Sequence, residues 1–403
     1  MIDIKLIRDN PQNFRKSMKG RITEKEVEEI LKIDAERKEK LKKIEELRAK
    51  QKKAQVTEAR KIKDERRKLE EEFKKIDEKW QKLLSEVPNI PDEDVPSGDA
   101  EKNVVVTEVG EVEEKESLPH WEIGKILDIL DFETASKISQ SFFPMLKGDG
   151  ARLEFALMNF FLEENEKYGF EPVCVPYLVN EGSVFGTGQL PKFKDELYHI
   201  EKDNLYLIPT GEVPAGNFFK DKILNEKDLP LRFQIPTPCF RREAGSWGKL
   251  GKGLIRNHQF HKVEIFSFTK PEDSNRELEQ MVKVVSEILK KLALPHRIIL
   301  LSSLDMGFSA SKTYDIEIWM NGLKRWVEVS SISNCRDFQT RRTKTRFKTK
   351  EGLKFPHSLN GSSLAVGRVF AGILENYWDK ENAQVNVPDC LKKFIKKDRI
   401  ERG

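Results

Sequence analysis

Two residues separated by one position, Arg241 and Glu243, carry side chains suited to holding a nucleotide. They lie in residues 240–246, which read as the end of a strand and a turn, and residues 256–260 read as the returning strand. Residues two apart on a strand point to the same face, so the guanidinium and the carboxylate should stand side by side. A guanidinium binds phosphates, and a carboxylate accepts hydrogen bonds from a base or a ribose. The pair therefore favours binding of a nucleoside triphosphate.

A second arginine lies far away in the sequence. Arg368 follows the run GSSLAVG and is placed just inside a predicted helix. Arginines that converge from separate elements stabilise the charge that develops during phosphoryl or nucleotidyl transfer. Glu328 and Ser331, three apart, offer an oxygen pair that could hold Mg²⁺. Each pattern also has an ordinary interpretation. Residues 241–243 could form a surface ion pair worth about 0–1 kcal/mol, and Glu328 and Ser331 could be a strand-end glutamate and a turn serine.

Composition restricts the class of protein. The chain has 403 residues, of which 38% are hydrophobic and 35% charged, and its formal net charge is +4. This length allows two domains with a sizeable core. The sequence has no run of 18 apolar residues, and residues 1–10 resemble neither a signal peptide nor an acid-poor transit peptide. Four scattered cysteines read as reduced thiols, so we expect a cytoplasmic protein that does not enter a membrane. The six histidines lack ligand spacing, so no zinc is expected.

Residues 23–86 are rich in Lys, Glu, Arg and Leu and contain no Gly or Pro. From Leu69 to Val87 the apolar positions follow a 4-3-4-3-4 spacing, which is the seam of a coiled coil. Two helices with a break near residues 55–57 would form an antiparallel hairpin. The alternative is a charged linker helix or a disordered tract. Between residues 48 and 68 there are ten Lys or Arg and three Asp or Glu, so the predicted tip carries 10 − 3 = +7. Such a run is often only a solvated face, but on a protruding rod it suits contact with phosphates.

The proline-rich residues 87–98 must end the second helix and read as a domain boundary. We therefore expect an N-terminal domain at residues 1–98 and a second domain at residues 99–403. The second domain combines helical runs with antiparallel hairpins, which predicts an α+β sheet flanked by helices.

The motifs GxGxxG and GxxxxGK[ST] are absent from the sequence, so Rossmann and P-loop nucleotide sites are excluded. The basic tail is expected to fray after Phe394. The expected helices are residues 151–167 and 271–292, and the expected strands are residues 205–208, 231–240, 262–268, 297–301, 314–319 and 325–331.

The two arginine segments resemble motifs 2 and 3 of the class II aminoacyl-tRNA synthetases, in particular those of the seryl-tRNA synthetase family. Four further segments match this family in order, and with them the resemblance covers nearly the whole chain. These segments are residues 172–193 (ending in GTGQLPKF), 208–214 (IPTGEVP), 305–310 (DMGFSA) and 328–335 (EVSSISNC).

The resemblance implies an enzyme that activates L-serine with ATP and Mg²⁺ and transfers it to tRNA(Ser), and also to tRNA(Sec). It implies a homodimer, formed through residues 151–179 around Pro176, and an antiparallel class II sheet behind an N-terminal coiled-coil arm that grips tRNA by shape. Arg241, at the α-phosphate, and Arg368, at the γ-phosphate, are the implied catalytic residues. The implied ATP site is Arg241, Arg242, Glu243, Arg256, Asn257, Phe260, Glu328, Val329, Ser330, Ser331 and Arg368, with Mg²⁺ on Glu328 and Ser331. The implied serine site is Thr210, Gly211, Glu212, Arg241, Glu264 and Ser362, and the implied tRNA contacts are Lys52, Lys53, Arg60 and Lys61.

Several points stay open at the level of sequence. Of the two pocket carboxylates, one should take the substrate ammonium and the other its hydroxyl, but which does which is undecided. The chain departs from the family at Gly211, where Ala is commoner, at Ser363, where Gly is usual, and at Trp247 and Leu250 in the motif 2 loop. Its arm is also shorter than the common bacterial one. Two alternative functions agree less well with the sequence. A homologue that activates an amino acid for a different acceptor would lack the N-terminal arm, and a non-catalytic RNA-binding or regulatory protein would have lost Arg241, Glu243, Glu328 or Arg368.

Overall fold

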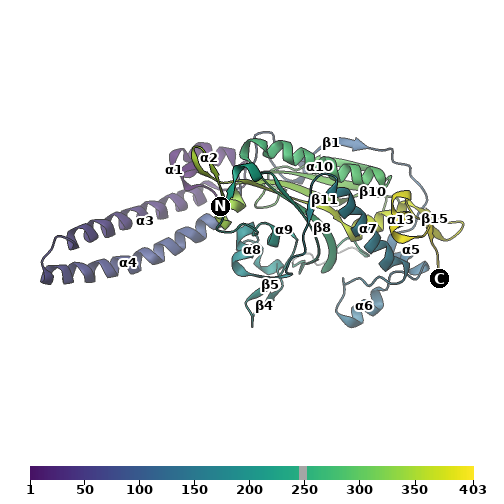
Figure 1. The fold of residues 1–403 in the computed structure, drawn as a ribbon, viewed down its shortest axis with the longest axis horizontal. Coiled ribbons are helices and arrows are strands. Elements are labelled where there is room, and N and C mark those ends of the chain that lie inside the picture. Colours follow the sequence, from purple (N-terminus) through teal and green to yellow (C-terminus); the bar gives the residue numbers. More distant parts are fainter. Residues whose placement is uncertain (245–251) are drawn as a thin grey trace.

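The computed structural model of the protein describes residues 1–244 and 252–403. A helical arm projects from one end of a body that is built around a large sheet (Figure 1). The helices are α1 (Ile4–Asp9), α2 (Pro11–Ser17), α3 (Glu24–Gln51), α4 (Val56–Ser85), α5 (His120–Ile126), α6 (Phe132–Ile138), α7 (Asp149–Glu166), α8 (Glu181–Thr187), α9 (Glu212–Ala215), α10 (Ser274–Lys291), α11 (Phe338–Thr343), α12 (Val366–Asn376) and α13 (Asp389–Ile395). The strands are β1 (Val104–Val109), β2 (Glu171–Pro172), β3 (Leu178–Asn180), β4 (His199–Ile200), β5 (Leu205–Leu207), β6 (Ile223–Asn225), β7 (Leu231–Phe240), β8 (Gln259–Thr269), β9 (His296–Leu300), β10 (Lys312–Met320), β11 (Arg325–Arg336), β12 (Arg346–Thr349), β13 (Gly352–Lys354), β14 (His357–Ala365), β15 (Trp378–Asp379), β16 (Gln384–Asn386) and β17 (Arg399–Ile400). Short 3-10 turns are η1 (Ala100–Lys102), η2 (Lys194–Glu196), η3 (Glu226–Asp228) and η4 (Pro271–Asp273).

The arm is the antiparallel hairpin that the heptad pattern predicts, and α3 and α4 are its two helices. A reciprocal capping box starts α3, because Thr23 accepts from the backbone of Glu26 and Glu26 accepts from the backbone of Thr23. Polar contacts between the helices add to the seam. Arg37 donates to Asp77 at 2.5 Å, and its guanidinium lies 4.5 Å from the centre of the Trp80 ring. These partly buried contacts fix the register of one helix against the other.

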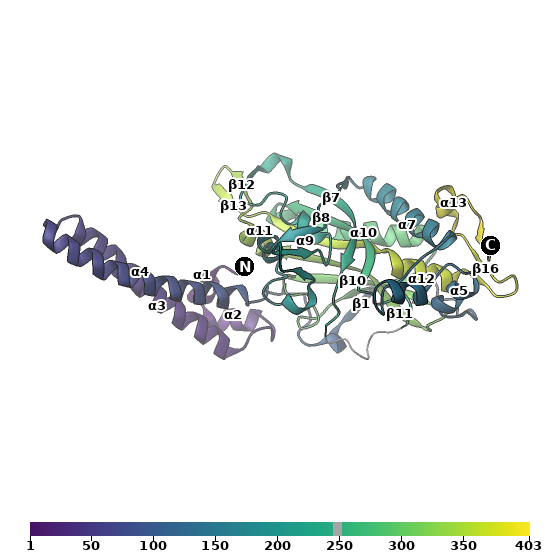
Figure 2. The same ribbon diagram turned by 90° about the horizontal axis from the view of Figure 1, so that it is seen from below.

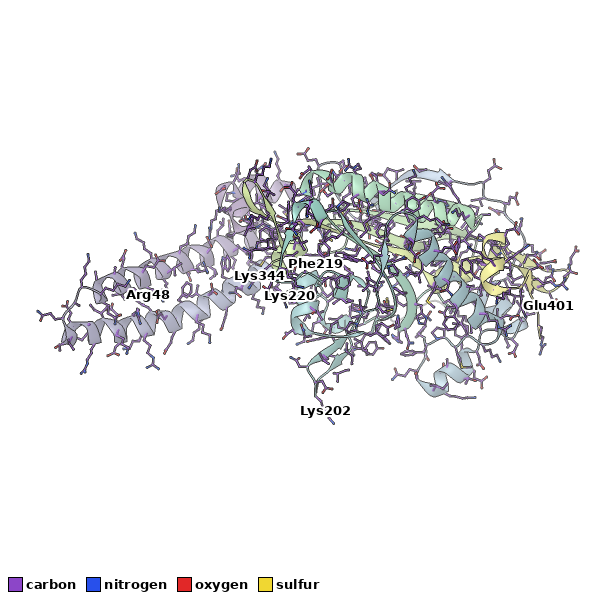
Figure 3. The ribbon with its side chains drawn as sticks, in the orientation of Figure 1. Arg48, Lys202, Phe219, Lys220, Lys344 and Glu401 are labelled. Carbon is purple, nitrogen blue, oxygen red and sulfur yellow. The ribbon has the colours of Figure 1, made fainter. Side chains whose placement is uncertain are left out.

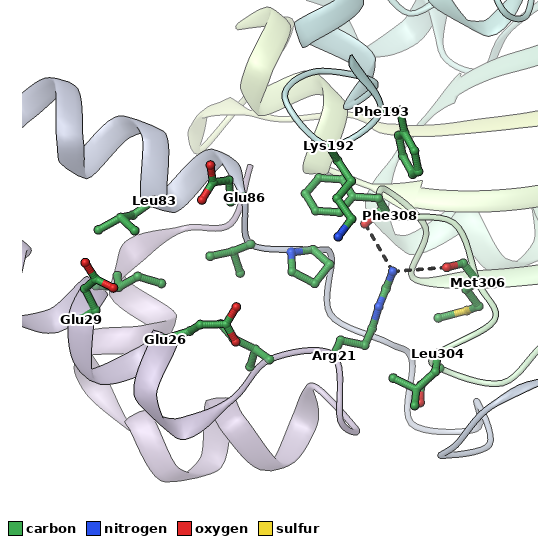
Figure 4. Close-up of a pocket in the computed structure, with 15 residues that line it drawn as sticks. Arg21, Glu26, Glu29, Leu83, Glu86, Lys192, Phe193, Leu304, Met306 and Phe308 are labelled. Carbon is green, nitrogen blue, oxygen red and sulfur yellow. Dashed lines mark hydrogen bonds between the residues drawn. The ribbon is translucent and has the colours of Figure 1, made fainter. Parts of the chain in front are cut away.

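The base of the arm is fastened to the body by Arg21, the residue two before the cap of α3 (Figure 4). Its guanidinium donates to the carbonyl oxygens of Asn89 and Ala310 at 2.9 Å and of Gly307 at 2.8 Å. A cleft of about 310 Å³ opens beside it between the arm and the body. Residues 87–98, predicted to be a boundary, run along the body, where Asn89 donates to Phe308 and Asp92 to Ser311 through their backbones. The division of the chain at residue 98 stays a prediction.

The body is the α+β architecture that the sequence predicts. Across the described residues the largest sheet has eight strands in the order β1-β9-β10-β11-β14-β8-β7-β2, and only the short β2–β7 pair is parallel. Helices α10, α12 and α7 pack against this sheet (Figure 2), and their apolar faces make the main core. Phe160, Val285, Ile316 and Leu374 are examples of its fully buried side chains. Strands β8, β11 and β14 carry the site residues that lie on strands, and Arg241 directly follows β7.

The expectation that the tail frays after Phe394 is wrong. Helix α13 continues to Ile395, and Arg399–Ile400 forms β17, which pairs with β16. Ile400 is fully buried in the main core, so one apolar side chain anchors a tail that is otherwise charged. Across residues 1–244 and 252–403, none of the helices is long and apolar enough to cross a membrane.

Candidate active site

The hairpin of β7 and β8 brings the predicted nucleotide residues together. Arg241 follows the end of β7. Its backbone N–H donates to the carbonyl oxygen of His258 at 2.9 Å, and this hydrogen bond closes the loop. The His258 ring also lies 2.9 Å from the carbonyl oxygen of Arg241. The Arg241 guanidinium lies 5.3 Å from the centre of the Phe260 ring and donates to the carbonyl of Pro209. Across the loop, Arg256 lies 3.3 Å from the Glu243 carboxylate. Glu243 has a φ of 51°, which is a left-handed backbone conformation.

The opposite wall of the site comes from β11 and the start of α12. Arg368 is in the first turn of α12, as predicted, and its guanidinium contacts both the backbone oxygen of Glu328 at 2.8 Å and the carboxylate of Glu328 at 3.2 Å. Ser331 and Asp315 are direct partners across the β10–β11 ladder, so their side chains share one face of the sheet. The Asp315 Oδ1 atom is enclosed and has no hydrogen-bond partner among the described residues. Burial and the charge of Glu328 raise the pKa of Asp315 well above its ordinary value.

The other end of the cleft is a buried polar pocket. Thr210 donates to Glu264 at 2.9 Å, and Lys262 contacts both of them, at 2.5 Å from the Glu264 carboxylate and 2.9 Å from the Thr210 hydroxyl. Ser362 is the cross-strand partner of Glu264, on β14. All four side chains are buried. The pocket therefore holds an ion pair of its own before any substrate enters.

Glu212, at the start of α9, is the second carboxylate of the pocket. One of its oxygens accepts from Gln339 at 2.6 Å and from Asn360 at 3.0 Å. Both donors are neutral amides, and in the described part of the chain Glu212 forms no ion pair. Burial, helped by the charge of Glu264, raises the pKa of Glu212 to about 7. The carboxylate is thus held ready for a cation that the protein itself does not supply.

These groups line a cleft of about 550 Å³ and a small neighbouring pocket, and Arg241, Glu243 and Arg256 line both. The predicted residues that line one or both of these spaces are Thr210, Glu212, Arg241, Glu243, Arg256, Asn257, Phe260, Glu264, Glu328, Ser331, Ser362 and Arg368.

Four predicted residues do not present their side chains to the cleft. Val329 is part of the main core, and the Ser330 hydroxyl donates to the carbonyl of Ser362. Arg242 is exposed, and Gly211 lies behind the pocket, where an added Cβ would be 2.9 Å from the Cβ of Glu264. The departures predicted at Trp247 and Leu250 lie outside the described residues. Ser363, the other departure, is buried and donates to Asn165 at 2.7 Å, away from the pocket.

Sequence reasoning missed several groups of the site. Lys262 could have been found, because it is two residues from Glu264 on a strand and so shares its face. Gln339 and Asn360 approach from α11 and β14, more than a hundred residues after Glu212, and no local pattern links them to it. Glu196 accepts from the backbone of Ala244 at 3.1 Å and supports the β7–β8 loop, again from a distant segment.

The predicted tRNA contacts lie at the free end of the arm. Lys52 and Lys53 follow α3, and Arg60 and Lys61 are in the first turns of α4. All four are exposed, and within residues 1–244 and 252–403 they take part in no ion pair. Figure 3 shows charged side chains projecting along both helices, with Arg48 near this end.

Comparison with known proteins decides the family. Residues 1–91 match the model of the seryl-tRNA synthetase N-terminal domain, and residues 193–377 match the model of the tRNA synthetase class II core domain (G, H, P, S and T). The serine–tRNA ligase of Nautilia profundicola is 48% identical over an alignment that covers 98% of this chain and 100% of that protein. The chain belongs to the seryl-tRNA synthetase family.

Solved structures agree with this membership of the seryl-tRNA synthetase family. The seryl-tRNA synthetase of Pyrococcus horikoshii, solved in complex with ATP, superposes with a TM-score of 0.93 at 34% identity, and all of both chains is covered. The M. kandleri enzyme, solved with A. aeolicus tRNASec, has a TM-score of 0.63 at 17% identity, covers 84% of this chain and 69% of its own, and shows a shared fold. The match of the N-terminal domain disfavours the first alternative function, since relatives that serve another acceptor are expected to lack the arm.

Proposed function

We propose that the protein is an ATP-dependent serine–tRNA ligase, which forms seryl-adenylate and transfers the seryl group to tRNA(Ser). The observation that supports this best is that the cleft holding the buried pair Glu212 and Glu264 shares Arg241 and Arg256 with a small neighbouring pocket, which Phe260 and Arg368 line. An anion-binding end and an ammonium-binding end, side by side, suit the condensation of an amino acid with a nucleotide.

ATP is proposed to bind at the Arg241 end. Phe260 stacks beneath the adenine, Glu243 accepts from its amino group, and Arg256 covers the base or contacts the phosphates. Arg241 neutralises the α-phosphate while the serine carboxylate attacks it, and Arg368 holds the γ-phosphate as pyrophosphate leaves. Asn257 lines the base pocket, Arg242 would act from the rim, and Val329 and Ser330 would contribute through their backbones. Little proton transfer is needed, so positioning and charge neutralisation supply most of the catalysis.

Mg²⁺ is proposed to bind beside Glu328 and Ser331. Mg²⁺ prefers oxygen ligands and commonly takes one or two of them from the protein and others from substrate phosphates. The enclosed, unpartnered oxygen of Asp315, on the same face as Ser331, fits a site that a cation completes. Held there by Glu328 and Ser331, the ion would supply positive charge that offsets the charge of the phosphates.

L-serine is proposed to bind between Glu212, Glu264, Thr210 and Ser362, with its carboxylate directed at Arg241. The Gly211 backbone forms the rear of this pocket. A site that hydrogen-bonds a hydroxyl rejects alanine, because its own buried polar groups would otherwise stay unpaired. Threonine must be excluded by the restricted space.

The arm is proposed to grip tRNA through Lys52, Lys53, Arg60 and Lys61, by contacts to phosphates. Such contacts read shape and not base sequence. Because they carry no base code, the same arm is proposed to accept tRNA(Sec) as well as tRNA(Ser). We propose a cytoplasmic location, which its four free cysteines support.

A homodimer is proposed through the face formed by α6 and α7. Ile138 is 72% exposed and Phe155 58% exposed, which is unusual for large apolar side chains on one surface. Together they line a groove of about 360 Å³ with Phe143, Met145 and Phe260. Covering this face with a second copy would bury apolar surface, and it includes part of the segment around residues 151–179 predicted to be an interface.

Exchange of pyrophosphate into ATP tests the proposal. We expect exchange that requires both serine and Mg²⁺, measured against all twenty amino acids. Arg241→Ala and Arg368→Ala should each lower kcat by roughly 10²-fold, the usual effect of losing one preorganised stabilising group. Equal exchange with threonine or alanine would refute the serine assignment, and near-normal adenylate formation by both variants would refute the phosphate roles.

A further inference from the structure

Lys262 is a buried cation that lines the substrate pocket and contacts one of its carboxylates. Its ammonium is 2.5 Å from the Glu264 carboxylate and 2.9 Å from the Thr210 hydroxyl, and Thr210 in turn donates to the same Glu264 oxygen at 2.9 Å. The three groups close a triangle on Oε2 of Glu264. The side chains of Lys262 and Glu264 are 8% and 2% exposed, so this ion pair is not a surface feature.

The triangle makes the two pocket carboxylates chemically different. The ammonium of Lys262 already neutralises the charge of Glu264 through one carboxylate oxygen. The other oxygen stays available to accept a hydrogen bond. Within residues 1–244 and 252–403, the Glu212 side chain accepts from the neutral amides of Gln339 and Asn360 alone. A buried carboxylate without a cation is costly and binds an incoming ammonium strongly, whereas a carboxylate that is already paired gains less from a second one.

We propose that Lys262 is a positioning residue that assigns the roles of the two carboxylates: paired with Lys262, Glu264 accepts the serine hydroxyl, and unpaired Glu212 accepts the serine ammonium. The proposal rests on the proposed function and settles the point left open by the sequence. Lys262 itself touches neither the reacting carboxylate nor the phosphates. It acts through Glu264 and Thr210, whose orientation it fixes.

Discrimination between serine and alanine follows from this arrangement. Alanine presents the same ammonium to Glu212 but leaves the free oxygen of Glu264 without a donor. Without Lys262, Glu264 becomes a second unpaired carboxylate in the same pocket. It would then take up a proton or compete with Glu212 for the ammonium, and in either case it would no longer act as a fixed acceptor for the hydroxyl.

The test compares kcat/KM for serine and for alanine in pyrophosphate exchange, using wild type, Lys262→Met, Glu264→Gln and the double variant. We expect Lys262→Met to lower kcat/KM for serine roughly 10²-fold and to change that for alanine less than about threefold. Glu264→Gln should do the same, and the double variant should discriminate no worse than Glu264→Gln, because Lys262 acts through Glu264. The double variant removes both charges of the Lys262–Glu264 pair and so leaves neither one unpaired, and it remains informative if Lys262→Met folds poorly.

Lys312 provides a matched control. It is also a buried lysine in an ion pair on the large sheet, 2.6 Å from Asp94, but it does not line the cleft. Lys312→Met should lower the Tm without altering the serine-to-alanine ratio. Equal losses for serine and alanine in Lys262→Met, or an unchanged ratio, would overturn the proposal. A wild-type chain that activates no serine would overturn the proposed function as well, so the two failures are distinguishable.

Discussion

Glu212 shows how one buried side chain couples binding to pH. The folded protein holds the pKa of this carboxyl at about 7, above the ordinary 4.5, because burial and the charge of Glu264 disfavour its ionised form. The unfolded chain loses this proton near pH 4.5, while the folded chain keeps it until about pH 7. The folded state therefore binds more protons in this interval, and stability contributed by Glu212 falls as pH rises from about 4.5 to about 7.

The first prediction is that Glu212→Gln flattens this decline. The free energy of unfolding of both proteins is measured with urea at several values from about pH 5 to about pH 8. Over this range the wild-type value should fall, relative to the value for the variant, by at most on the order of 3 kcal/mol. Serine should reverse part of the difference, because its ammonium favours the ionised carboxylate. Binding of serine below about pH 7 should release a proton, detected as a dependence of the calorimetric heat on the buffer. Parallel pH curves for the two proteins would contradict the prediction.

Gly211 illustrates a different constraint, that of space. A Cβ at this position would be 2.9 Å from the Cβ of Glu264 and 3.3 Å from a methyl group of Ile235, so one of these must move. We predict that Gly211→Ala costs about 1–3 kcal/mol of stability and lowers kcat/KM for serine, because it displaces Glu264. Gly307→Ala is the matched control, since a Cβ there meets nothing within 4 Å. Urea unfolding and pyrophosphate exchange measure the two effects, and a Gly211→Ala protein with wild-type values in both would show that the pocket adjusts freely.

At the scale of elements, periodic features were readable from the sequence and contacts between distant segments were not. The 4-3 spacing predicted the arm, and the β-rich runs predicted β7 in full and β8, β10 and β11 with shorter limits than the structure has. Arg241, Glu243 and Phe260 could be placed together because one hairpin carries them. Gln339, Asn360 and the pairing of β17 depend on the tertiary fold, and the charged composition of the tail concealed the anchoring role of Ile400.

The third prediction belongs to the arm. In the tip variant, Lys52, Lys53, Arg60 and Lys61 are all changed to Glu. The slope of log K for tRNA binding against log salt concentration should become shallower by about 0.7–0.9 for each phosphate that is no longer neutralised, and binding should weaken most at low salt. Serine activation should not change, because every residue of the cleft lies in the body. Lys25→Glu with Lys32→Glu, two changes of lysines near the base of α3, is the control for charge alone. If this control alters the salt dependence as much as the tip variant does, tRNA does not bind specifically at the tip.

At the scale of the whole molecule, the exposed apolar face of α6 and α7 continues into the active site. The groove that Ile138 and Phe155 border is also lined by Phe260 and His261, and Phe260 is the residue proposed to stack on adenine. His261 contacts Glu154 of α7 at 3.1 Å, so α7 and β8 are joined at this point. A partner that covers this face would therefore support the base pocket from behind.

The fourth prediction follows from this continuity. Phe155→Glu would place a charge in the proposed interface and should convert the dimer to a monomer at micromolar concentration in sedimentation velocity. Its KM for ATP should rise while its far-ultraviolet circular dichroism stays that of the wild type. Leu353→Glu is the matched control, since Leu353 is also exposed and apolar but lies on β13, far along the chain from this face. A Phe155→Glu protein that stays dimeric would refute the interface.

The fastening at Arg21 has a consequence for the size of the RNA that the enzyme can use. The guanidinium joins the start of the arm to carbonyls of residues 89, 307 and 310, so the arm cannot swing freely about its base. Helix α3 has 28 residues and so extends about 42 Å. A stiff rod of set length and set angle works as a caliper: an RNA held at its tip presents its 3′ end to a cleft only if its own dimensions match the span.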